Sequence, residues 1–119
     1  MTAQERILIV DDEGEMRELL AKVLEKNGYQ VTAAADGGSA LGLLEKESMD
    51  LVITDVRMPG MDGMEALKAI KELNPDTGVI IMTAFGSIDQ AVQAVKEGAH
   101  DYISKPFKID EMLLTIRKA

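Results

Sequence analysis

Short apolar runs alternate along the chain with segments in which apolar residues recur every three or four positions. Several of the runs are nearly unbroken Val, Ile and Leu, which is typical of strands buried on both faces of a parallel sheet. The strand candidates are Ile7–Val10, Val31–Ala35, Leu51–Ile53, Val79–Met82 and Tyr102–Ile103. The second of these runs is the weakest, because it is mostly Thr and Ala.

The segments between the runs have the spacing of amphipathic helices, with apolar residues at i, i+3, i+4 and i+7. The predicted stripes are Met16, Leu19, Leu20, Val23 and Leu24; Met64, Leu67, Ile70 and Leu73; Ile88, Ala91, Val92 and Val95; and Ile109, Met112, Leu113 and Ile116. A further helix from about Ser39 to Lys46 is weakened by Gly42. Helices are expected to stop at Gly28, at Asn74 with Pro75, and at Gly98.

Strict alternation of strands and helices predicts an α/β fold with an open five-stranded parallel sheet, in the order 2-1-3-4-5, and helices on both faces. A chain of 119 residues forms one domain, here residues 1–119. In such sheets ligands bind beyond the carboxyl ends of the strands, where the strand order reverses. For this order, the expected site lies between the first and third strands.

Polar residues follow the apolar runs at that rim of the sheet. They are Asp11, Asp12 and Glu13 after the first run, Asp55 after the third, Thr83 after the fourth, and Ser104, Lys105 and Pro106 after the fifth. Carboxylates brought together there repel one another by roughly 4 kcal/mol per pair at an effective dielectric constant near 20. Mg²⁺ prefers oxygen ligands and offsets that repulsion. We therefore expect a Mg²⁺ site formed by Asp11, Asp12, Asp55 and a main-chain carbonyl just after Asp55.

This arrangement suits phosphoryl chemistry. With the metal reducing the repulsion between two anions, Asp55 can act as a nucleophile toward a phosphoryl group. Lys105 supplies a positive charge for the phosphoryl oxygens, and Thr83 supplies a hydroxyl donor.

Composition limits the partners. The net charge of −8 opposes binding to DNA or RNA. The N-terminal apolar run is too short for a signal peptide or a membrane span, so a cytoplasmic location without membrane contact is expected. The absence of cysteine excludes disulfides and thiolate metal sites.

Four motifs in this order resemble the receiver domain of two-component response regulators: "ILIVDDE", "ITDVRMPGMDG", "IIMTA" and "DYISKPF". The stretch "TAFGSIDQAVQAVKEGAHDYISKPF" resembles the nitrogen-regulator class, whose members activate transcription through an ATPase domain. The resemblance implies that Asp55 accepts a phosphoryl group from a sensor histidine kinase. It also implies that Asp11, Asp12 and the carbonyl of Arg57 bind Mg²⁺.

The same resemblance assigns Thr83 and Tyr102 as a switch pair and Lys105 as the phosphate contact. It implies a protein that catalyses only its own phosphorylation and slow dephosphorylation, and that forms a homodimer on phosphorylation. Residues 1–119 are then expected to be the N-terminal domain of a longer regulator with ATPase and DNA-binding effector domains. A stand-alone single-domain regulator is the alternative.

Simpler roles exist for the individual residues. Asp11 and Asp12 could cap the first helix, Asp55 could begin a turn, Lys105 could pair with a surface acid, and Tyr102 could be a buried ring. These roles do not explain why the polar groups share one rim of the predicted sheet.

Two other function classes also use this type of sheet. A phosphohydrolase of the haloacid dehalogenase type needs a second Asp two residues after its nucleophile, where this chain has Arg57. A flavin or nucleotide carrier needs a phosphate-binding first loop, and "DDEGE" would repel phosphate. No phosphate-binding G-x-x-x-x-G-K-[ST] motif is present.

Overall fold

The computed structural model describes residues 5–55, 63–83, 88–104 and 108–118. Five parallel strands form one sheet in the order β2-β1-β3-β4-β5, which confirms the predicted topology. The strands are β1 Arg6–Val10, β2 Gln30–Ala34, β3 Leu51–Asp55, β4 Gly78–Thr83 and β5 Asp101–Ser104. The helices are α1 Gly14–Lys26, α2 Gly37–Lys46, α3 Gly63–Leu73, α4 Ile88–Lys96 and α5 Ile109–Lys118.

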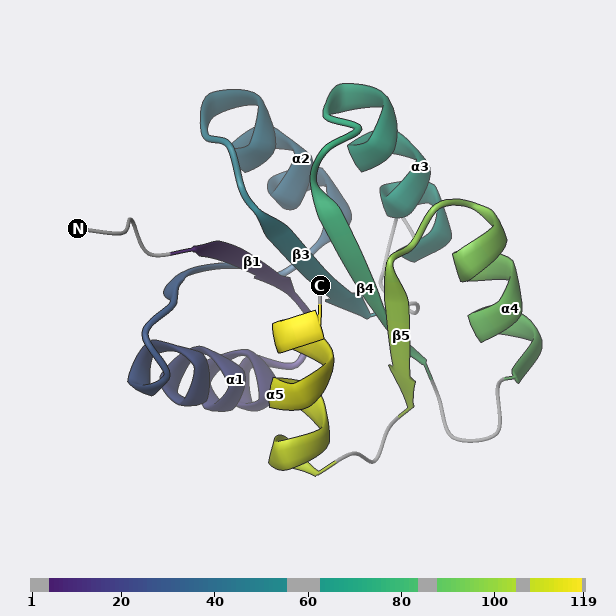
Figure 1. Cartoon of the computed structure of the whole chain (residues 1–119). Coiled ribbons are helices and arrows are strands. Elements are labelled where there is room, and N and C mark those ends of the chain that lie inside the picture. The colour runs from purple at the N-terminus through teal and green to yellow at the C-terminus, as the bar shows by residue number, and fades with distance from the viewer. Residues whose placement is uncertain (1–4, 56–62, 84–87, 105–107, 119) are drawn as a thin grey trace.

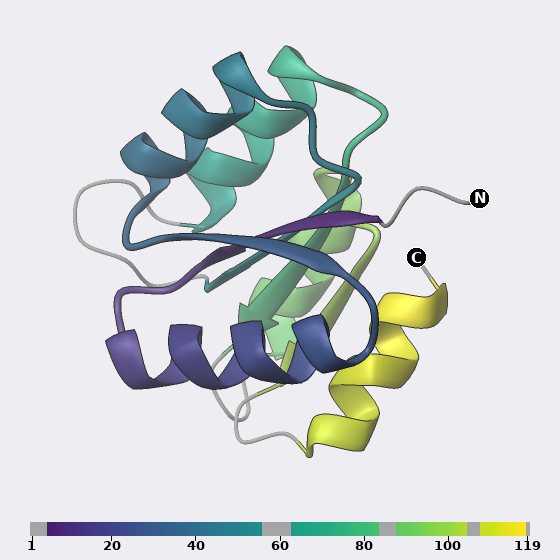
Figure 2. The same ribbon diagram turned by 90° about the vertical axis from the view of Figure 1, so that its left-hand side faces the viewer.

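Helices cover both faces of the sheet (Figures 1 and 2). Alternate residues along each strand point to opposite faces, so two cores form. One core packs Leu8 and Val52 against α2, α3 and α4, and the other packs Ile9 and Ile53 against α1 and α5. Strands covered on both faces explain why the apolar runs are continuous.

The strands differ from the predicted runs at their ends. β2 lies one residue earlier than expected, and the other strands extend beyond the apolar residues by one or two positions. Asp55 and Thr83 are therefore the last residues of β3 and β4 rather than residues that follow them. Backbone pairing with neighbouring strands continues past the point where side chains stop being apolar.

Two predicted helical stripes are partly wrong. Leu20 and Leu24 of α1 are buried, but Leu19 is about half exposed. In α4 the buried position is Ala94, whereas Val92 and Val95 are 47% and 48% exposed. The predicted stop signals are confirmed at Gly28 and Gly98, which adopt φ values of 91° and 109° that other residues rarely adopt.

α2 is longer than predicted, because it begins at Gly37 and not at Ser39. The helix also continues through Gly42, which was expected to weaken it. Its N-cap is Asp36, whose Oδ1 accepts a hydrogen bond of 2.7 Å from the N–H of Ser39. This bond satisfies one of the backbone donors that a helix start leaves without a partner. Asp36 was not among the helix signals predicted from the sequence.

Candidate phosphoryl and metal site

Carboxylates from two adjacent strands converge at the carboxyl rim of the sheet. β1 and β3 are paired with Val10 opposite Thr54, so Asp11 and Asp55 are the next residues along the two strand directions. Carboxylate oxygens of Asp11, Asp12 and Asp55 lie within 4.8 Å of one another. The predicted convergence of these three residues is confirmed.

The three carboxylates differ in their exposure. Asp11 is fully buried and Asp55 is 9% exposed, whereas Asp12 is exposed to solvent. Burial of acidic groups is costly unless they are hydrogen-bonded, paired or bound to a cation. A cluster with two inner carboxylates and one outer carboxylate provides oxygen ligands of the kind that a divalent cation such as Mg²⁺ prefers.

The loop between β1 and α1 is held by two hydrogen bonds. Asp11 Oδ1 accepts a bond of 2.9 Å from the N–H of Glu13, and the main-chain carbonyl of Asp11 accepts one of 2.6 Å from Arg17 Nη1. The N-cap of α1 is Glu13, so Asp11 and Asp12 both precede the capping position. The alternative in which Asp11 and Asp12 cap the first helix is therefore wrong.

Arg17 is a site residue that the sequence pattern did not indicate. Its one available signal was its place in the first turn of a helix, where the helix dipole favours acidic residues over basic ones. The negative charge of the neighbouring acidic cluster stabilises a cation at this position. By bonding the carbonyl of Asp11, Arg17 also fixes the loop that carries two of the three carboxylates.

Thr54 is a second residue that was not singled out. It is fully buried, and its hydroxyl donates to the main-chain carbonyl of Asp55 at 3.2 Å. Thr54 precedes Asp55 within β3, and its side chain contributes to the hydrogen bonding of the strand end. Thr is common in strands, so its presence at position 54 gave no sign of this hydrogen bond in the sequence.

The remaining candidates are only partly described. Thr83 ends β4, where it is paired with Ser104 of β5, and it follows Met82, the residue paired with Asp55. Its backbone therefore lies at the same rim as the carboxylates. Arg57 and Lys105 lie outside the described residues, so their predicted roles have no structural test.

Tyr102 lies in β5 and is 43% exposed. The alternative in which its ring is a buried core aromatic is wrong. Tyr102 is paired with Ile81 of β4, and β5 is the edge strand of the sheet next to β4.

Among the described helices, none combines the length and the apolar character needed to cross a bilayer.

Comparison with protein families adds a match over nearly the whole chain. The family model described as "Response regulator receiver domain" matches residues 7–117. This range contains all three carboxylates of the cluster and every residue predicted for the site.

Individual relatives fall into two groups by length. The chain is 46% identical to "Sporulation initiation phosphotransferase F" of Bacillus subtilis, and the match covers 96% of this chain and 92% of that protein. It is 41% identical to "DNA-binding transcriptional regulator NtrC" of Salmonella typhimurium, over 95% of this chain but only 24% of that protein. This chain thus spans about a quarter of the length of the transcriptional relative.

Among solved structures, the chemotaxis protein CheY4 of Vibrio cholerae superposes with a TM-score of 0.91 at 32% sequence identity. The superposition covers 98% of each chain. The strand order and the alternation of helices are therefore those of the CheY-like fold.

Proposed function

Because the chain belongs to the response regulator receiver domain family, we propose that it is a signalling switch that is phosphorylated on Asp55. The observation that carries the proposal is the convergence of three carboxylates from β1 and β3 within 4.8 Å. Family membership implies a histidine kinase as the partner that donates the phosphoryl group. It also makes the protein a receiver domain rather than an enzyme with a substrate of its own.

The donor set of the cluster fits Mg²⁺, because all three side chains offer carboxylate oxygens and two of them are withdrawn from solvent. Asp11, Asp12 and Asp55 would hold the ion, together with the main-chain carbonyl of Arg57. When bound, Mg²⁺ would reduce the electrostatic repulsion between the carboxylates and an incoming phosphoryl group.

Asp55 is the proposed nucleophile. A carboxylate oxygen of Asp55 would form a bond to phosphorus while the bond from phosphorus to the histidine nitrogen of the donor breaks, and that nitrogen would keep the bonding electron pair. Lys105 would contact the phosphoryl oxygens as a positive charge. Arg17 would act as a positioning residue, because it holds the loop of Asp11 and Asp12 rather than the reacting atoms.

The response to phosphorylation would pass through β4 and β5. The phosphoryl group adds negative charge and hydrogen-bond acceptors at Asp55, and the hydroxyl of Thr83 would bond one of its oxygens. Tyr102 would then turn inward from its exposed position in β5. The surface expected to change comprises α4, β5 and α5, and it is also the candidate surface for a homodimer formed on phosphorylation.

For the output, the match over 92% of phosphotransferase F supports the stand-alone alternative better than a transcriptional effector. Residues 1–119 would form a receiver domain that acts by contacting, or passing its phosphoryl group to, another protein. The match to NtrC covers 24% of that protein, so the comparison does not reach its effector part, and the ATPase and DNA-binding domains expected from the nitrogen-regulator resemblance stay a prediction. The cytoplasmic location stays a prediction.

Phosphorylation can be tested with acetyl phosphate and MgCl₂, followed by intact mass measurement. We expect a stable adduct of one phosphoryl group that disappears in Asp55→Asn. Asp76→Asn, which removes an exposed carboxylate in the turn after α3, is the matched control and should be labelled like the wild type. An adduct on Asp55→Asn, or rapid multiple turnover with no adduct, as in a phosphohydrolase, would contradict the proposal.

The coupling through Thr83 needs a separate measurement. Thr83→Ala should still accept the phosphoryl group, but the backbone amide shifts of α4 and β5 on phosphorylation should be much smaller than in the wild type. A wild-type shift pattern from Thr83→Ala would refute the switch role without affecting the assignment of Asp55.

A further inference from the structure

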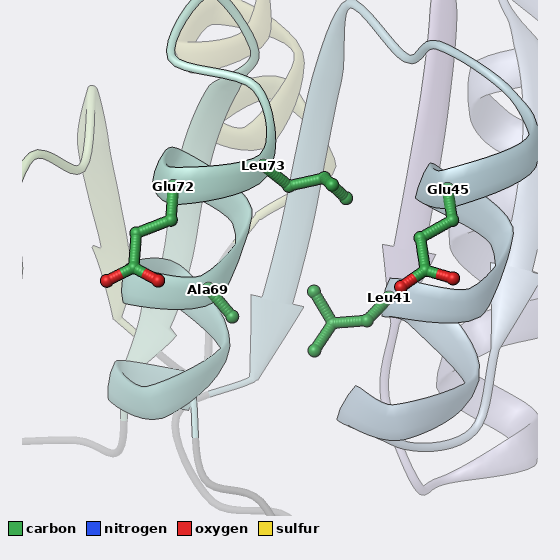
Figure 3. Close-up of a pocket in the computed structure, with 5 residues that line it drawn as sticks. All are labelled: Leu41, Glu45, Ala69, Glu72 and Leu73. Atoms are coloured by element: carbon green, nitrogen blue, oxygen red, sulfur yellow. The ribbon is translucent and has the colours of Figure 1, made fainter.

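A groove separates the C-terminal halves of α2 and α3, on the face of the sheet opposite to α1 and α5. Its volume is about 330 Å³, near the lower end of the range for ligand sites. Leu41 of α2 and Leu73 of α3 point toward one another across it, and Ala69 lies beside them (Figure 3). Leu73 is 45% exposed, so this apolar surface is accessible.

Two acidic side chains flank the leucines. Glu45 on α2 and Glu72 on α3 both line the groove, and both are exposed (Figure 3). Neither forms an ion pair with any residue in the described part of the chain. The groove therefore has an apolar centre and an exposed glutamate on each of its two helices, with the carboxylate of Glu72 directed away from α2 (Figure 3).

None of the nearby lysines of the described helices forms an ion pair with either of these two glutamates. Lys68 pairs with Glu97 of α4 at 3.4 Å, and Lys71 Nζ donates to the carbonyl of Thr77 at 2.7 Å. Lys46 lines a second recess, between α2 and β2, which Glu45 also lines, but no ion pair joins these two residues. A ligand with positive charges on both sides of an apolar stripe would supply what the groove lacks.

The groove lies away from the carboxylate cluster. The helices that follow parallel strands run back antiparallel to them, so the C-terminal ends of α2 and α3 lie at the opposite edge of the sheet from Asp11 and Asp55. An occupant of the groove would leave the proposed phosphorylation site open. The groove is thus independent of the proposed function.

We propose that this groove docks a basic amphipathic helix of another protein. An apolar residue of that helix would sit between Leu41 and Leu73, and the small side chain of Ala69 would let its backbone come close. Lys or Arg residues bordering its apolar stripe would pair with Glu45 and Glu72. A partner bound in this way would be held in both the phosphorylated and unphosphorylated states.

The probe is a helical peptide of about 18 residues, the length of five turns, with Leu on one face and Lys on the others. Titrated into the ¹⁵N-labelled protein, it should shift amide signals of α2 and α3 more than those of other elements. Leu73→Ser should weaken binding about tenfold, because a buried apolar contact is lost. Glu45→Gln with Glu72→Gln should weaken it about threefold to tenfold.

Matched variants separate docking from general attraction to an acidic protein. Glu18→Gln with Glu25→Gln removes two exposed charges from α1, and Leu114→Ser removes an exposed leucine from α5. Both should bind the peptide within about twofold of the wild type, a difference of about 0.4 kcal/mol. Far-UV circular dichroism of each variant establishes that it is folded.

Three results would overturn the proposal. The first is a shift map centred on another surface, and the second is equal weakening by the α1 charge variant. The third is concentration-dependent self-association, measured by sedimentation, that Leu73→Ser abolishes, because a second copy of this chain would then be the occupant.

Discussion

Asp36 shows at the scale of one residue how a local hydrogen bond changes an acid. The N–H of Ser39 donates to its carboxylate, and the Ser39 hydroxyl donates as well, so the pKa of Asp36 lies below its ordinary value of 3.8. Each bond favours the charged form that accepts it. The charged form also suits the positive end of the α2 dipole.

A carboxyl-carbon NMR titration should therefore find the pKa of Asp36 below 3.8. Ser39→Ala should raise this pKa only part of the way back, because the larger contribution comes from the backbone N–H, which remains. An unchanged pKa in Ser39→Ala would rule out a contribution from the hydroxyl.

The lowered pKa also sets a direction for stability. The contribution of ionised Asp36 is fully present above pH 3.8 and is lost as the pH falls through the folded-state pKa. Asp36→Asn keeps a capping oxygen but does not titrate there. The free energy of unfolding of the wild type should thus fall relative to Asp36→Asn as the pH is lowered through this range, and a constant difference would contradict the assignment.

At the scale of elements, α4 differs most from what its apolar pattern predicts. It packs the small side chain of Ala94 against the core and leaves Val92 and Val95 about half exposed. Tyr102 of β5 is also exposed, at 43%. Among the α4 positions whose burial the structure describes, Ala94 alone is buried in the core, and this small contact fits the proposed place of α4 in the changing surface.

Substitutions in α4 test this orientation. Val92→Lys should change the free energy of unfolding by less than about 0.5 kcal/mol, as expected for a surface position. Ala94→Leu should lower it by about 1–3 kcal/mol, because the added atoms have no space in the packed core. Urea denaturation measures both, and the reverse ranking would show that the valines face the sheet.

At the scale of the whole molecule, acidic charge acts in two ways. The net charge of −8 produces a diffuse repulsion that any salt screens. The cluster of Asp11, Asp12 and Asp55 instead concentrates charge at one point, which is the proposed site for a divalent cation. The two contributions can be distinguished by the identity of the salt.

We expect MgCl₂ to stabilise the protein more than NaCl at the same ionic strength. At a free Mg²⁺ concentration ten times the Kd, the additional gain is about 1.4 kcal/mol. Asp12→Asn should remove most of the additional gain, and Asp76→Asn should retain it. Equal stabilisation by the two salts would indicate that the cluster does not bind Mg²⁺ selectively.

The sequence predicted the strand order and the carboxylate cluster because continuous apolar runs require helices on both faces, and such a sheet brings its strand ends to one rim. It could not predict the rotation of α4, because a valine stripe outweighs one alanine in any apolar pattern. The sequence pattern also could not predict hydrogen bonds between residues that are far apart in the chain. The buried hydroxyl of Thr77 donates to the carbonyl of Met49 at 3.1 Å, across 28 positions of the sequence.

Asp50 makes the most extensive of these distant contacts, at the edge of the sheet opposite the carboxylate cluster. Its carboxylate and its N–H both bond the backbone of Arg6 in β1, and its carbonyl accepts from the N–H of Gly78 in β4. One residue before β3 thus joins the starts of three strands.

In amide hydrogen exchange, β1, β3 and β4 should therefore open as one cooperative unit, while the edge strands β2 and β5 open separately at lower free energy. The hydrogen bonds of Asp50 thus hold the register of the central strands at one edge of the sheet. The opposite edge, which carries the carboxylate cluster, can rearrange without changing that register.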